Sequence, residues 1–110
     1  MKARAVLSAA AAALAFGASG AHALDERGAQ ALMKKSGCLK CHAVSAKKEG
    51  PPFKETAAKY KGKPDGEAEV FKHLTTSPMI EVDGNKERHD NLKTKNEAEI
   101  RNVVQYILTR

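Results

Sequence analysis

The stretch that decides the fold is Cys38-Leu39-Lys40-Cys41-His42, a Cys-x-x-Cys-His pattern that holds both cysteines of the 110-residue chain. This spacing is typical of covalent haem attachment. Two thiols add to the two vinyl groups on one edge of a porphyrin, so they must lie a short, fixed distance apart. The next residue, His42, then offers an imidazole to the iron as proximal ligand. The stretch therefore predicts one haem c, attached through Cys38 and Cys41.

Three other interpretations of the cysteine pair compete with haem attachment. A dithiol redox motif is expected in a thioredoxin-like βαβ unit, and the sequence shows no such pattern. A structural zinc site usually needs four ligands from paired motifs, whereas His73 and His89 are not at zinc-finger spacing. A simple disulfide between Cys38 and Cys41 is the third interpretation. The N-terminus and the later loops favour haem over all three.

The first 23 residues have the pattern of a secretory signal peptide. Lys2 and Arg4 precede a run rich in Ala and Leu, and Ala21-His22-Ala23 is a small-x-small cleavage site. The apolar run is too short to serve as a stable membrane anchor. Cleavage would leave residues 24–110 as one small domain, which we expect in the periplasm.

The charge balance of the chain is basic, with 19 Lys and Arg against 13 Asp and Glu. Removing Lys2 and Arg4 leaves a net charge of about +4, and the basic residues are interleaved with acidic ones. Nucleic-acid binding would need a concentrated basic face with stacking aromatic residues, and the chain has no Trp. We therefore expect no nucleic-acid partner. The interleaved charges favour an ordinary solvated surface, and the second interpretation is a weakly basic face that steers docking to an acidic redox protein.

The mature chain has the pattern of four short helices joined by loops that contain Gly and Pro. The predicted helices are Asp25 to Lys35, Phe53 to Lys61, Glu67 to Thr75 and Asn96 to Leu108. The long loop from Met79 to Lys95 includes Asp83-Gly84, a strong turn signal, and predicts a small hairpin over residues 80–88. Such a long loop in a compact domain is usually functional.

The order of these features resembles a small periplasmic class I cytochrome c of bacterial type, over nearly the whole mature chain. The features are a helix, the haem motif, Gly50-Pro51, Tyr60-Lys61-Gly62 and a C-terminal helix with Tyr106. The resemblance implies an all-α fold around one covalent haem. It also implies that the carbonyl of Pro51 accepts a hydrogen bond from Nδ1 of His42, and that Tyr106 packs where the first and last helices cross.

The sixth iron ligand is where the chain departs from this family, which usually places a Met-Pro pair just ahead of the last helix. Two candidates lie in the long loop. Met79 follows Pro78 but lies far upstream of the family position, whereas alignment back from Tyr106 puts that position at or beside His89. We therefore expect His42 and His89 as the axial pair, with Met79 as the alternative. An open distal side is a third alternative.

The remaining candidates have simpler explanations. Met33 lies on the apolar face of the first helix and is expected in the core. His73 lies on a helix near lysines and is expected to be exposed.

The sequence shows no set of residues typical of an active site that processes a substrate, so the prediction is a monomeric electron carrier and not an enzyme. The alternative function is a haem protein with a displaceable distal ligand that binds or senses small gases, and a peroxidase is a weaker one.

Overall fold

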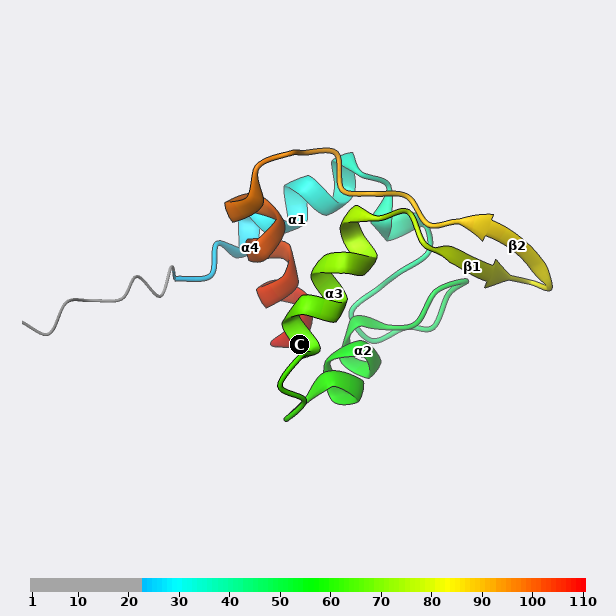
Figure 1. Cartoon of the computed structure of the whole chain (residues 1–110), viewed down its shortest axis with the longest axis horizontal. Coiled ribbons are helices and arrows are strands. Elements are labelled where there is room, and N and C mark those ends of the chain that lie inside the picture. The colour runs from blue at the N-terminus through cyan, green and yellow to red at the C-terminus, as the bar shows by residue number, and fades with distance from the viewer. Residues whose placement is uncertain (1–22) are drawn as a thin grey trace, which may run out of the picture.

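The computed structural model describes residues 23–110, so the predicted signal peptide lies outside the described residues except for its last position. The described part of the chain forms four α-helices, one short 3-10 helix and one two-stranded hairpin (Figure 1). In chain order these are α1 (Glu26–Lys35), η1 (Cys38–Lys40), α2 (Phe53–Tyr60), α3 (Gly66–Thr75), β1 (Met79–Val82), β2 (Asn85–Arg88) and α4 (Glu97–Leu108). In this part of the chain, no helix is long and apolar enough to cross a membrane.

The predicted helices are all present, and their ends differ by only one residue from those expected. Asp25 caps α1 by accepting a hydrogen bond from Gly28 N at 2.9 Å. The start of α4 differs from a complete capping box, in which Glu99 would accept from Asn96 N. Asn96 does cap Glu99 N at 3.2 Å, but the Glu99 carboxylate accepts from the Thr94 hydroxyl, and Asn96 N donates to the Thr94 hydroxyl oxygen.

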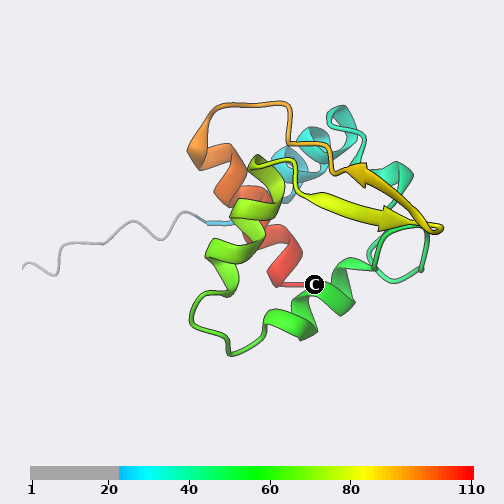
Figure 2. The same cartoon turned by 45° about the vertical axis from the view of Figure 1, so that its right-hand side comes forward.

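The predicted hairpin is confirmed, with antiparallel pairing from Met79 opposite Arg88 to Val82 opposite Asn85. Asp83 and Gly84 form its turn with φ of 50° and 80°. Positive φ at both central residues is the backbone that a two-residue hairpin turn requires. The hairpin extends away from the helices (Figures 1 and 2), and every residue of β2 is exposed.

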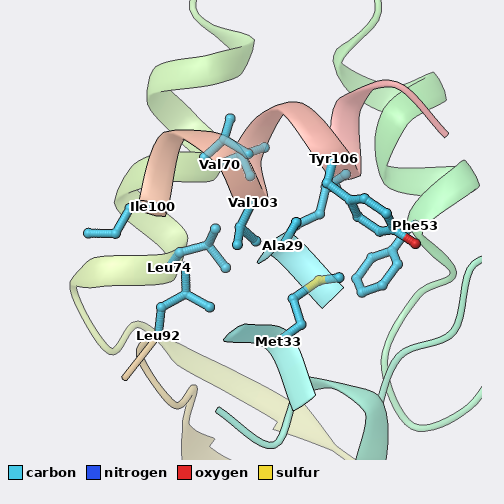
Figure 3. Packing of buried hydrophobic residues seen from close by; sticks show 11 residues of the cluster. Ala29, Met33, Phe53, Val70, Leu74, Leu92, Ile100, Val103 and Tyr106 are labelled. Carbon is cyan, nitrogen blue, oxygen red and sulfur yellow. The ribbon is translucent and has the colours of Figure 1, made fainter. Parts of the chain in front are cut away.

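The core forms where α1 crosses α4. Ala29 of α1 and Val103 of α4 are both fully buried, and Met33 and Tyr106 are almost so. The small side chain of Ala29 lets the two helices approach closely, as Figure 3 shows. The crossing is also tied by hydrogen bonds, because the Asn102 side chain accepts from Asp25 N at 3.0 Å and donates to Asp25 O at 2.7 Å.

Helices α2 and α3 complete the core by packing against α4. The Phe53 ring of α2 meets the Tyr106 ring edge-on, with centroids 6.3 Å apart (Figure 3). On the other side of the cluster, Leu74 of α3 lies with Ile100 and the loop residue Leu92 (Figure 3). The helices therefore fix the position of two segments, the stretch from η1 to α2 and the loop between α3 and α4.

Candidate haem site

The end of α1 delivers the two cysteines into one tight turn. Gly37 has a φ of 78°, which favours glycine, and it redirects the chain from α1 into η1. Backbone NH groups of Cys41 and His42 then both donate to the carbonyl of Cys38, at 3.2 and 2.9 Å. This turn gathers Cys38, Cys41 and His42 within one short segment, as attachment to a single porphyrin edge requires.

Both thiols are free and partly exposed, so the two cysteines form no disulfide. Burial raises the pKa of the Cys38 thiol. Burial and the Glu49 carboxylate raise the pKa of the Cys41 thiol, whose sulfur lies 3.5 Å from Glu49 Oε2. The thioredoxin-like alternative also fails, because the described sheet is one antiparallel hairpin with no βαβ unit.

The His42 ring is held by the loop that follows it. Its Nδ1 lies 2.7 Å from the carbonyl oxygen of Pro51, so a protonated Nδ1 donates there and the other ring nitrogen is left to bind a metal. Gly50 N donates to Cys41 O at 2.8 Å, which closes the loop. The His42 ring also stacks on Phe53, with centroids 5.4 Å apart and planes 20° apart.

His89 faces His42 from the distal loop. Their ring centroids are 6.2 Å apart, and the ring planes are tilted by 53°. The half-buried His89 ring keeps Nδ1 buried without a hydrogen-bond partner in the described protein. Burial lowers the pKa of His89, and a charge on His42 lowers it further, which favours the neutral imidazole that metals bind.

Met79, the alternative ligand, begins β1 and is 56% exposed. It pairs with Arg88, so these two side chains share one face of the hairpin, and the next residue, His89, belongs to the other face. The backbone NH of His89 donates to Pro78 O at 2.8 Å, which continues the pairing by one step. Met79 and His89 therefore lie at the same end of the hairpin but on opposite faces.

His73 is the residue whose position the sequence did not indicate. It is exposed, as expected of a helix surface, yet its ring centroid lies only 4.3 Å from that of His89. Burial of part of the ring lowers the pKa of His73, and charges on His89 and His42 add to this effect. The only available signal was a histidine in the last turn of α3, which by itself says nothing about a neighbour in a later loop.

These residues fit a haem between His42 and His89. Two imidazoles that bind one metal from opposite sides, each at about 2 Å, have ring centroids about 6 Å apart. The observed 6.2 Å matches that arrangement. Leu39 and Met79, the exposed large apolar residues in the described chain, belong to the haem motif and to the hairpin. A structural zinc site does not fit, because no group of three or more His, Cys, Asp or Glu in residues 23–110 could hold a metal ion.

Comparison with known proteins bears on the fold and on the haem motif. The family model for cytochrome c matches residues 26–110. The class 1 cytochrome MtoD of Sideroxydans lithotrophicus ES-1 is 38% identical with a TM-score of 0.75, over 79% of this chain and 97% of that one. Cytochrome c552 of Nitrosomonas europaea is 26% identical with a TM-score of 0.56, over 73% of this chain and 96% of that one.

A curated relative is cytochrome c-551 of Pseudomonas aeruginosa, which is 40% identical over 57 residues. That match covers 52% of this chain, and the chain spans only about half of the length of this relative. The family model, by contrast, covers all four helices, the haem motif and the distal loop. The chain therefore belongs to the cytochrome c family, with a class I fold and a haem c attached through Cys38 and Cys41.

Proposed function

We propose that this protein is a periplasmic, monomeric electron carrier whose haem iron is bound by His42 and His89. The observation that carries this proposal is the 6.2 Å separation of the two imidazole centroids. Bound haem supplies one Fe(III)/Fe(II) couple, and electron transport is the role that the cytochrome c family implies. The proposal assigns no catalytic residue, because carrying an electron requires no substrate-processing group.

On the proximal side, the chain's contribution is to hold the His42 ring in one orientation. The hydrogen bond from Nδ1 to the Pro51 carbonyl fixes the tautomer, and the Phe53 ring limits rotation of the imidazole. An imidazole that donates such a bond is a more basic ligand. A ring with little freedom to move also changes little between the two oxidation states, which suits fast electron exchange.

On the distal side, an imidazole in place of a methionine thioether has a direct consequence for the potential. A methionine ligand raises the haem potential, so His42 and His89 together predict a lower potential than a His/Met carrier of the same fold. The proposed donor and acceptor are therefore proteins that work at lower potential.

The charge of the described domain supports acidic redox partners. The basic residues near the haem motif include Lys40, Lys47 and Lys48, which are exposed, and Lys48 Nζ also donates to Leu39 O at 2.8 Å. These exposed lysines would attract an acidic protein and raise the association rate at low salt, and they stand beside the carboxylates of Glu49, Glu87 and Asp90, which also lie near Cys41. The N-terminal pattern of residues 1–23 supports export to the periplasm.

The test of this function is electrochemistry on the purified holoprotein, combined with exposure of the reduced protein to carbon monoxide. A carrier with two imidazole ligands gives one reversible one-electron wave, and its reduced spectrum does not change when carbon monoxide is added. Rapid carbon monoxide binding to the untreated protein would instead support the alternative function, a haem protein that binds or senses small gases through a displaceable distal ligand.

A further inference from the structure

The distal side of the site contains a second imidazole beside His89. The His73 and His89 ring centroids are 4.3 Å apart, with planes tilted by 58°. This separation is shorter than the 6.2 Å between His89 and His42. His73 projects from the last turn of α3, whereas His89 lies in the loop just after β2. Two elements that are separate in sequence therefore bring two potential iron ligands to one place.

Hydrogen bonds from Asn91 and Leu92, here called the clamp, hold the segment after His89 against the end of α3. Asn91 donates through Nδ2 to the carbonyl of Thr75 at 3.1 Å and accepts from Ser77 N at 2.8 Å. Leu92 N also donates to Leu74 O at 3.0 Å. The segment after His89 is thus tied to the end of α3, so the proximity of the two rings is built into the fold.

The two rings differ in how they are supported. His73 is carried by a helix whose Val70 and Leu74 are buried in the core. His89 follows a strand whose four residues are all exposed. A ligand on such a loop can move away from the iron more easily than one on a packed helix, because fewer buried contacts oppose the motion.

We propose that His73 is a second distal ligand, which binds the haem iron when His89 leaves it. In the exchange, the coordinate bond from His89 breaks and one from the neutral His73 imidazole forms, so no electron or proton is gained or lost. The iron would then be linked to α3 instead of the loop. This inference rests on the proposed His42 and His89 ligation. It predicts that the iron keeps a sixth ligand when His89 dissociates.

The test uses the holoprotein in a Met79→Leu background, which removes the thioether as a competing ligand. In the oxidised protein, His89→Ala is expected to remain low-spin, with shifted electron paramagnetic resonance g values. Adding His73→Ala is expected to abolish the low-spin signal. As a matched control, adding Lys72→Ala in place of His73→Ala leaves the low-spin signal intact, since Lys72 is an exposed neighbour on the same helix.

The inference is overturned if His89→Ala already converts the iron to high-spin, or if the low-spin signal survives the added His73→Ala. Circular dichroism of each variant separates ligand loss from unfolding, and both histidine positions are partly accessible to solvent. Failure of the proposed function has a different signature. In that case the Met79→Leu protein, with both histidines present, would itself lose the low-spin signal of the wild type.

Discussion

His42 and His89 face each other with ring centroids 6.2 Å apart, although one follows the haem-attachment turn and the other lies in the loop after the hairpin. The His42 ring and the main chain of His89 are each held by a hydrogen bond to a proline carbonyl. His42 Nδ1 lies 2.7 Å from Pro51 O, and His89 N donates to Pro78 O at 2.8 Å. The helical core holds these two loops apart by a distance that suits one metal between two imidazoles.

Gly50→Ala is expected to displace the His42 ring. A Cβ at this position would lie 2.5 Å from His42 Cε1 and 2.8 Å from Nδ1, so the ring must shift and weaken its bond to Pro51. We expect a loss of about 1–3 kcal/mol in the free energy of unfolding, as for other overpacked sites. Denaturant titration followed by circular dichroism measures the loss, and the haem absorption spectrum should change in the native protein.

Gly62→Ala is the matched control for that change. Gly62 has a φ of 74°, and no heavy atom lies within 4 Å of the place that the added methyl group would occupy, so only backbone strain is added. The left-handed conformation costs about 1–2 kcal/mol for a residue with a Cβ. This variant should lose stability with an unchanged haem spectrum. An unchanged spectrum in both variants would show that Gly50 does not constrain the His42 ring.

Ala29→Leu is expected to separate α1 from α4. Ala29 is fully buried against the crossing, where Val103 is also fully buried, so the larger side chain has no space. The expected loss in the free energy of unfolding is about 1–3 kcal/mol. Ala31→Leu, at an exposed position of the same helix, should change stability by less than about 0.5 kcal/mol. Equal effects at the two positions would contradict the packing described for the crossing.

Asn91→Ala is expected to loosen the loop that carries His89. It removes the bonds to Thr75 O and Ser77 N, which are partly open to water, so the cost in stability is about 1 kcal/mol. The larger effect should be on ligand exchange. Cyanide should bind to the oxidised holoprotein faster than in the wild type, as measured by stopped-flow absorption. Asn85→Ala, in the exposed strand β2, should leave that rate unchanged, and equal acceleration by both changes would argue against the clamp.

Much of the fold could be predicted from the sequence because its signals are local. The haem motif depends on residue spacing, the hairpin depends on Asp83-Gly84, and the apolar stripe of α4 marks its buried face. The capping of α4 is less readable from the local pattern, because Thr94 lies outside the usual capping positions and makes bonds to both Glu99 and Asn96 N.

The closeness of His73 to His89 could not be predicted in this way. It depends on how the end of α3 meets the loop after β2, through side-chain bonds from Asn91 that join residues distant in sequence. Met79 and His89 lie on opposite faces of the hairpin for a similar reason. Their placement depends on the strand register, which pairs Met79 with Arg88. A shift of one residue would have placed Met79 opposite His89, on the same face of the hairpin.

The most direct test of the proposed axial pair is the spectrum of the oxidised holoprotein, compared with Met79→Leu and His89→Ala variants. Near-infrared absorption and electron paramagnetic resonance should give a low-spin signal of two imidazoles, with no methionine–iron charge-transfer band. Met79→Leu should leave this spectrum unchanged, and His89→Ala should shift the g values. A methionine–iron band in the wild type that disappears in Met79→Leu would contradict the His42 and His89 pair.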